Sequence, residues 1–371
     1  MQPWLTGLTG NPSSPHDPGR RARAAVDDAC GRLAGLLNAP AETLVITSGG
    51  TESIMTALAS AVALQPDKPL VLISSIEHSA TRQAAGQLVG AENCRILPVD
   101  HGGRFDLAAL ADILRTDGPR LAVASLLWAS NETGVLPGIG AAAAMLRHAG
   151  VLVHADAVQA VGKIPLDLSA APVDMLSLSG HKFHAPMGTG ALYIRPGMRF
   201  HPYLVGGGQQ NGRRAGTENV AGIVGLGAAA SLAARRLADG SVAATTTRRD
   251  HFEARLLAAM PDTIRIGDPA HRLGNTSCLR FPGCPATLVL SILDDLGLAA
   301  SAGAACTSRT AEPPRGLVAL GLSRDEAAES LRFSLGCTTS DAEIDSALAT
   351  IITSISRVRA SHSGARVVFQ G

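Results

Sequence analysis

Continuous apolar runs recur along the first two thirds of the chain and are separated by helix-like segments. The runs are continuously apolar instead of alternating, which is typical of strands covered on both faces of a sheet. Between them, the segment 53–64 places Ile54, Leu58 and Val62 on one helical stripe, and 138–148 is an alanine-rich helix candidate. The pattern predicts an α/β fold with a mainly parallel seven-stranded sheet. Its strands are expected at 43–48, 70–75, 95–99, 121–128, 151–156, 175–179 and 190–194.

The βαβ rhythm ends near residue 240, where helices and shorter strand candidates follow at 263–267, 277–281, 298–303 and 331–335. We therefore expect a large α/β domain over 12–240. A smaller α+β domain is expected over 241–360, joined by residues 1–11. The last residues, 361–371, are polar at first and predict a disordered tail.

Composition narrows the class of protein. The chain has 371 residues, of which 46% are hydrophobic and 17% charged, so it can build a large core. The formal net charge of +1 gives no reason to expect direct nucleic-acid or membrane binding. The six cysteines form no closely spaced pair, and the N-terminus does not read as a signal peptide. We expect a cytoplasmic protein with reduced thiols and no metal site.

A glycine-rich turn follows the first predicted strand. Gly49 and Gly50 allow a ligand to approach the backbone, and Thr51 can cap the helix that follows. Backbone N–H groups at a helix N-terminus bind phosphate well, although capped glycine turns are also common without any ligand. The turn is therefore a candidate anion site. It is not a Walker motif, because it lacks the Gly-Lys-Ser/Thr ending.

Four further polar residues each stand at or just after the end of a predicted strand: His78, Asn131, Asp156 and Lys182. Each alone could be an ordinary turn or surface residue. Together with Thr51, these residues make five polar candidates on one edge of the predicted sheet. Ligands of open α/β sheets bind at the carboxyl ends of the strands, so this grouping favours a binding site. A lysine and an aspartate at neighbouring strand ends suit pyridoxal phosphate (PLP), which bonds to a lysine amine and pairs its pyridine nitrogen with a carboxylate.

Three segments remain open between a functional and a structural interpretation. The loop 206–217 opens with three consecutive glycines, also contains Arg213, Arg214 and Thr217, and could reach an anion or be a solvated loop. Cys306 stands among small residues, either as an accessible thiol or as a packing cysteine. Arg332 lies in an apolar strand candidate, where it could bind a substrate carboxylate or form a structural salt bridge.

The motifs resemble those of the cysteine desulfurases, PLP enzymes of fold type I in the class V aminotransferase group. The resemblance spans nearly the whole chain and rests on Thr-Ser-Gly-Gly-Thr-Glu-Ser, Glu-His, Asn-Glu-Thr-Gly, Asp-Ala-Val-Gln, Ser-Gly-His-Lys, Arg-Ala-Gly-Thr and Ala-Cys-Thr-Ser. The last motif resembles the subgroup that includes the iron–sulfur-cluster and nitrogenase-associated enzymes.

The resemblance implies a role for each matching position. Lys182 would hold PLP covalently, Asp156 would pair with its ring nitrogen, and His78 would stack on the ring. Asn131 and Arg332 would bind the substrate carboxylate, and Cys306 would accept sulfur. The remaining cofactor contacts would come from the phosphate-binding Gly50, Thr51, Ser179 and His181, from Gln159 at the ring hydroxyl, and from Thr217 at the cofactor of a neighbouring subunit.

These roles imply conversion of L-cysteine to L-alanine, with a persulfide on Cys306 that is passed to a sulfur-acceptor protein by a homodimeric enzyme. Two alternatives stay open. A selenocysteine lyase would have less need for the thiol. A weakly active sulfur-relay or scaffold component would fit the short stretch ahead of Gly10-Asn11-Pro12, where the family has a short strand and a turn.

Overall fold

The computed structural model describes residues 1–7, 10–302 and 313–365, and these residues divide into two units. The first unit comprises Met1–Pro98, Phe105–Ala129 and Pro137–Asp239. The second comprises Val99–Arg104, Ser130–Leu136 and the chain from Gly240 onward. Residues 1–11, which the sequence groups with the smaller domain, fall in the first unit wherever the structure describes them.

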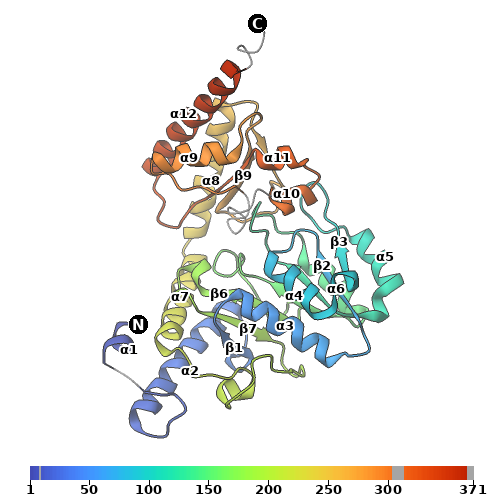
Figure 1. The fold of residues 1–371 in the computed structure, drawn as a ribbon. Helices are drawn as coiled ribbons and strands as arrows, with labels where there is room; N and C mark the ends of the chain where they lie inside the picture. The colour runs from blue at the N-terminus through green and yellow to red at the C-terminus, as the bar shows by residue number, and fades with distance from the viewer. Residues whose placement is uncertain (8–9, 303–312, 366–371) are drawn as a thin grey trace. The chain divides into compact units, whose positions relative to one another are not determined.

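The first unit contains a seven-stranded sheet in the order β1-β7-β6-β5-β4-β2-β3 (Figure 1). β7 is antiparallel to both of its neighbours, and the other adjacent pairs are parallel. The mainly parallel seven-stranded α/β sheet expected from the sequence is therefore confirmed. The strands are β1 (Leu44–Thr47), β2 (Leu70–Ser74), β3 (Cys94–Leu97), β4 (Leu121–Leu127), β5 (Leu152–Asp156), β6 (Met175–Ser179) and β7 (Gly190–Ile194).

Helices cover this sheet because its strands are apolar on both faces. Side chains of α3 (Gly50–Leu64) and α4 (Ser79–Val89) pack with the strands in one buried cluster that includes Ile54, Leu58, Val71 and Leu192. The other helices of this unit are α1 (Gln2–Thr6), α2 (Asp17–Leu37), α5 (Leu107–Asp117), α6 (Ile139–His148) and α7 (Val220–Ala238).

Among the helices in the described residues, only α7 is long and apolar enough to cross a membrane, with a mean hydropathy of 1.3. It packs along α2 (Figure 1). A Cβ at Gly227 of α7 would stand 2.6 Å from the Cα of Ala29 in α2, so the two backbones approach closely. This packing accounts for the apolar character of α7 as that of a core helix.

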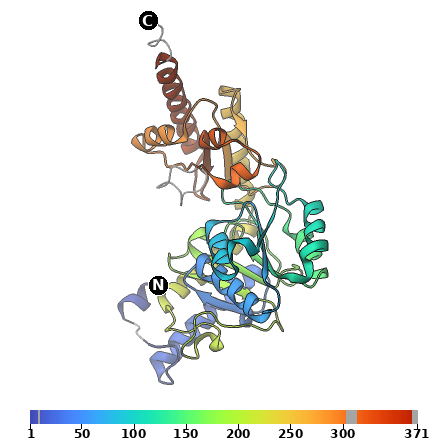
Figure 2. The same cartoon turned by 45° about the vertical axis from the view of Figure 1, so that its right-hand side comes forward.

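The second unit contains a three-stranded antiparallel sheet in the order β10-β9-β8. Its strands are β8 (Ile264–Arg265), β9 (Thr276–Arg280) and β10 (Ser330–Ser334). α12 (Asp341–Ala365) packs against both α8 (Ser241–Ala259) and α9 (Ala286–Asp295), as two views show (Figures 1 and 2). Two short helices complete the described part, α10 (Arg315–Ala319) and α11 (Arg324–Ala328).

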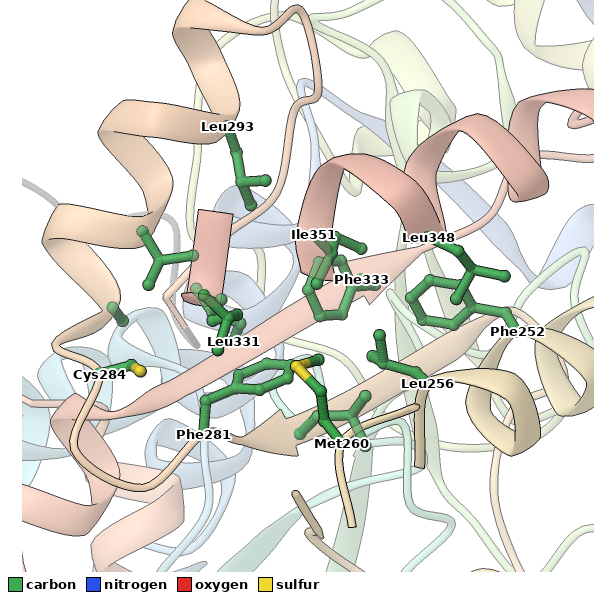
Figure 3. Packing of buried hydrophobic residues seen from close by; sticks show 14 of the residues in the cluster. Phe252, Leu256, Met260, Phe281, Cys284, Leu293, Leu331, Phe333, Leu348 and Ile351 are labelled. Atoms are coloured by element: carbon green, nitrogen blue, oxygen red, sulfur yellow. The ribbon is translucent and has the colours of Figure 1, made fainter. Parts of the chain in front are cut away.

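Aromatic rings form the centre of this second core (Figure 3). The ring of Phe333 on β10 meets Phe252 of α8 edge to face at 5.4 Å and Phe281 at 6.4 Å. Leu348 and Ile351 of α12 belong to the same buried cluster. One apolar core thus joins the strands β9 and β10 to the helices α8, α9 and α12.

Two sequence expectations for this unit differ from the structure. The strand expected at 298–303 is wrong where it is described, because 298–302 contains only a single bridge between Ser301 and Arg332. The apolar side chains of Leu298, Ala300 and Ala302 pack against the second core without pairing as a strand. α12 also continues to Ala365, past the expected start of the tail at 361, while 366–371 lie outside the described residues.

Candidate active site

Four of the five polar residues expected at the strand ends lie at one edge of the large sheet. β1, β2, β5 and β6 run in the same direction, because the reversed strand β7 separates β1 from β6. Their carboxyl ends lead to Thr51, His78, Asp156 and Lys182 respectively. Asn131 follows β4, but it belongs to the second unit.

The N-terminus of α3 forms an open backbone cradle. Its N-cap is Gly49, so no side chain caps the first N–H groups. A Cβ at Gly50 would come within 2.7 Å of Val158 Cγ2 and 3.6 Å of Ser179 Cβ. β7 also approaches closely, since a Cβ at Gly190 would lie 2.6 Å from the Cα of Gly49. The turn therefore presents bare N–H donors beside Ser179, as an anion site requires.

Lys182 and its neighbours occupy a 3-10 turn, Gly180–Phe183, directly after β6. Ser179 Oγ and His181 Nδ1 are hydrogen-bonded at 2.9 Å, which fixes two polar side chains next to the α3 cradle. Lys182 is exposed, and its positive charge acts on both Asp156 and His78. The structure thus brings these three strand-end residues within electrostatic reach of one another.

Asp156 is the buried acid of the site, with 3% of its surface exposed. Burial raises the pKa of this carboxyl to about 6, against the opposing effects of the Val158 N–H and the Lys182 charge. Oδ1 accepts from the backbone N of Val158 at 3.0 Å. A buried carboxylate that gains from nearby positive charge is suited to hold a protonated ring nitrogen.

Gln159 lies one turn beyond Asp156. Its Oε1 accepts a 2.5 Å hydrogen bond from Lys163 Nζ. With this oxygen engaged, the amide N–H groups of Gln159 are the part that can donate to a ligand oxygen.

His78 is the N-cap of α4, and its Nδ1 accepts from the backbone N of Ala80 at 3.1 Å. This acceptor role places the ring proton on Nε2. Burial lowers the pKa of His78, as do the charges of Lys182 and Arg82. The site therefore contains a neutral imidazole whose orientation is set by the helix start.

Thr217 is exposed in the segment that leads into α7. Next to it, Arg214 makes two hydrogen bonds to the carboxylate of Glu52, at 2.8 and 3.2 Å. Burial opposes the ionisation of Glu52, but Arg214 and Ser48 hold its pKa below the usual value. This ion pair joins the 206–217 loop to the first turn of α3.

The two expected carboxylate-binding residues meet within the second unit. Arg332 on β10 donates from Nη1 to the carbonyl oxygen of Asn131 at 2.6 Å. Ser130 Oγ accepts from the backbone N of Glu132 and of Thr133, each at 3.2 Å, and thereby holds the turn that carries Asn131. The sequence did not indicate this contact, because the two residues come from distant segments.

Cys306 lies outside the described residues. None of the five cysteines that the structure describes is in a disulfide bond. Burial raises the pKa of Cys30 to about 11 and that of Cys278 to about 12, and it also raises the pKa values of Cys94 and Cys284. These four are thiols at neutral pH and therefore weak nucleophiles.

Two buried groups near the site were missed by sequence reasoning. His154 lies in β5, with Nδ1 2.8 Å from Ser125 Oγ and Nε2 2.7 Å from Ser177 Oγ. Glu77, directly before His78, is also buried. A histidine inside an apolar strand and an acid at a strand end were the available signals, but their burial depends on the tertiary fold.

Comparison with known proteins identifies the family. A family model for aminotransferase class V matches residues 1–347. The cysteine desulfurase of Cereibacter sphaeroides is 42% identical over 363 residues, covering 97% of this chain and 92% of the relative.

Solved structures agree with this assignment. A NifS-like protein superposes with a TM-score of 0.85 at 28% identity, covering 96% of this chain and 94% of the other. The protein SspA in complex with cysteine gives a TM-score of 0.77 at 27% identity, with 90% and 93% of the two chains covered. The chain therefore belongs to the class V aminotransferase family, and over nearly its whole length it is similar to cysteine desulfurases.

Proposed function

We propose that this protein is a PLP-dependent cysteine desulfurase, which converts L-cysteine to L-alanine and collects the sulfur on Cys306. The observation that carries the proposal is a buried acid, Asp156, that lies within electrostatic reach of the Lys182 charge at the neighbouring strand end. The relatives named cysteine desulfurase give the reaction, and the cysteine bound to SspA gives the substrate.

The residues present fit PLP. Its phosphate needs N–H and hydroxyl donors, and the α3 N-terminus offers uncapped N–H groups in a cradle that a Cβ at Gly50 would fill. Its pyridine nitrogen needs a buried carboxylate, and Asp156 is one. Its aldehyde needs an amine, which Lys182 carries at the end of β6.

We assign a different contact with the cofactor to each of these residues. Asp156 would hold a proton at the ring nitrogen, His78 would cover the ring, and Gln159 would donate to the ring hydroxyl. When bound, PLP supplies an electron sink for the carbon skeleton of the amino acid. The phosphate contacts that we assign are Gly50, Thr51, Ser179 and His181.

Substrate binding is assigned to Arg332 and Asn131. A guanidinium forms paired, charge-assisted hydrogen bonds with a carboxylate, and the carboxylate is the group common to the substrate and the product. Arg332 already donates to the carbonyl oxygen of Asn131, which orients the arginine and the turn together. This pair therefore orients the amino acid.

The sulfur transfer balances without a further reactant. The Cys306 thiolate attacks the sulfur of the substrate, so that a new S–S bond forms and the Cβ–S bond breaks. The electron pair of that bond stays with the substrate carbon, which takes up a proton to give alanine. We assign the movement of protons at the substrate to the Lys182 amine. Its positive charge acts on both Asp156 and His78, which places it in the same site.

We further propose that the enzyme is a homodimer and that its sulfur passes to a protein acceptor. Thr217 would contact the cofactor phosphate of a second copy in a homodimer; its exposure ahead of α7 supports this role. The persulfide would pass to a sulfur-acceptor protein. The cytoplasm, where thiols stay reduced, is the compartment that we propose, because the five described cysteines are in no disulfide bond.

The test is formation of alanine from L-cysteine by the PLP-loaded protein, measured beside Lys182→Ala. We expect the wild type to absorb visible light and to release one alanine per cysteine consumed. Lys182→Ala should lose both the characteristic absorbance and turnover. Alanine formation that persists unchanged in Lys182→Ala would overturn the assignment of this lysine and the proposed reaction.

A further inference from the structure

Glu77 is a buried acid that the proposed reaction does not use. It stands between β2 and α4, one residue before His78, with 2% of its surface exposed. An acid in this position is costly to ionise, so the protein needs a reason to keep it there.

The contacts of Glu77 join three elements of the first unit. Its Oε1 accepts from Ser74 Oγ at the end of β2, at 2.6 Å, and from the backbone N of Leu127 at the end of β4, at 2.8 Å. Its backbone carbonyl accepts from Arg82 Nη1 in α4 at 2.8 Å. Both groups that donate to Oε1 are neutral, a hydroxyl and an amide.

The second carboxyl oxygen differs from the first. Oε2 is buried and has no hydrogen-bond partner among the described residues. Burial, together with the negative charge of Asp156, raises the pKa of Glu77 to about 8 against the opposing effects of Ser74, Leu127 and the Thr81 hydroxyl. A proton on Oε2 would remove the cost of burying a second charge there.

We propose that Glu77 is a positioning residue that acts as a neutral carboxylic acid: it ties the turn before His78 to the ends of β2 and β4 and leaves Asp156 as the anion of the buried pair. This inference rests on the proposed PLP site. It goes beyond that site because it gives a role to a group to which we assign no contact with cofactor or substrate.

Two carboxyl groups that act on each other inside a protein do not both ionise readily. Asp156 has the stabilising contacts for a charge, namely the Val158 N–H and the positive charge of Lys182. The Glu77 carboxyl, by contrast, accepts from neutral donors, Ser74 and Leu127. The proton is therefore held by Glu77, and Asp156 is free to pair with a protonated ring nitrogen.

The test applies the same neutral replacement to both acids. Glutamine keeps an acceptor oxygen for Ser74 and Leu127, so Glu77→Gln should bind PLP within about threefold of the wild type. Asp156→Asn removes a charged partner, and PLP affinity should fall by about 10- to 100-fold, the range of a charge-assisted hydrogen bond. Both affinities are measured by titrating the apoprotein with PLP and following its absorbance.

A third variant tests the tie itself. Glu77→Leu keeps a side chain of similar size but removes the hydrogen-bond acceptor for Ser74 and Leu127. PLP affinity should therefore fall together with the thermal stability of the apoprotein. If Glu77→Leu binds PLP as well as the wild type does, Glu77 positions nothing and the inference is overturned. If Glu77→Gln loses as much affinity as Asp156→Asn, the charge of Glu77 is required and the inference is equally overturned.

A second measurement needs neither cofactor nor turnover. A carboxyl with a raised pKa in the folded state makes the protein less stable as pH rises through that value. The apoprotein should therefore lose stability between about pH 6 and 8, and Glu77→Gln should lack this loss. An identical pH profile in the two proteins would contradict a protonated Glu77. If Asp156→Asn binds PLP normally while this profile behaves as expected, the PLP assignment fails and the protonation of Glu77 stands.

Discussion

Arg332 donates a hydrogen bond from Nη1 to the carbonyl oxygen of Asn131 at 2.6 Å, although 201 positions separate the two residues in the chain. Both belong to the second unit, whereas the residues that we assign to the cofactor belong to the first. Substrate binding and cofactor binding can therefore be altered by separate substitutions.

Arg332→Lys should weaken binding of cysteine without changing PLP. Lysine keeps the charge but lacks the planar pair of donors that matches a carboxylate. We expect KM for L-cysteine to rise by about 10- to 100-fold, with PLP absorbance at wild-type intensity. Steady-state kinetics and an absorbance spectrum of the same preparation give both values.

Arg280→Lys is the matched control, because Arg280 lies on the neighbouring strand β9 and pairs with Glu326 and Glu329. Its KM should stay at the wild-type value. An unchanged KM in Arg332→Lys as well would contradict the carboxylate role of Arg332.

Gly190→Ala should weaken PLP binding through the α3 cradle. The added Cβ would lie 2.6 Å from Gly49 Cα and 2.7 Å from the carbonyl oxygen of Leu178, so the phosphate-binding turn must shift. We expect a loss of PLP affinity of at least tenfold, on the order of 1.4 kcal/mol, measured by titration of the apoprotein.

Gly140→Ala is the control for a glycine replacement in the same unit. Gly140 lies inside α6, and a Cβ there meets nothing within 4 Å. Alanine should stabilise this helix by about 0.5–1 kcal/mol and leave PLP affinity unchanged. Equal PLP affinities in the two variants would show that the cradle does not bind the phosphate.

His154 should make the protein sensitive to acid. Burial lowers the pKa of this imidazole to about 3, so the folded state excludes a proton that the unfolded chain accepts near pH 6.5. The contribution of this group to the free energy of unfolding is therefore highest above pH 6.5. It decreases as pH falls below this value, because only the unfolded chain takes up the proton. Between pH 7.5 and 5 the loss should be about 2 kcal/mol.

Urea unfolding of the wild type and of His154→Gln at both pH values isolates this effect, because other groups contribute alike to the two proteins. Glutamine can still bond to Ser125 or Ser177 but does not titrate. The free energy of unfolding of the wild type, relative to that of His154→Gln, should be smaller at pH 5 than at pH 7.5. If this difference in unfolding free energy is the same at both pH values, His154 does not remain neutral in the folded protein.

The sequence predicted the large sheet well because its strands are buried on both faces and read as uninterrupted apolar runs. The strand ends followed from that topology, which explains why His78, Asp156 and Lys182 share one edge. The segment 298–303 was mistaken for a strand because apolar residues packed against a core resemble a short buried strand in sequence.

Tertiary burial could not be predicted in the same way. The sequence shows Glu77 beside His78, but its isolation from solvent depends on Leu127, fifty positions away. The hydrogen bonds of His154 to Ser125 and Ser177 likewise need three strands in register. Local patterns therefore indicated which residues reach the site, and long-range packing decided their protonation.

The central claim is that sulfur moves from cysteine to Cys306, and mass spectrometry of the protein after a single turnover tests it most directly. Wild type and Cys306→Ala are each loaded with PLP and given one equivalent of L-cysteine, beside Cys30→Ala as a control thiol. We expect one added sulfur on the peptide with Cys306 in the wild type and in Cys30→Ala, together with one alanine per site. Cys306→Ala should carry no added sulfur and form little alanine. Full alanine formation by Cys306→Ala would contradict the account and favour a lyase that does not need the thiol.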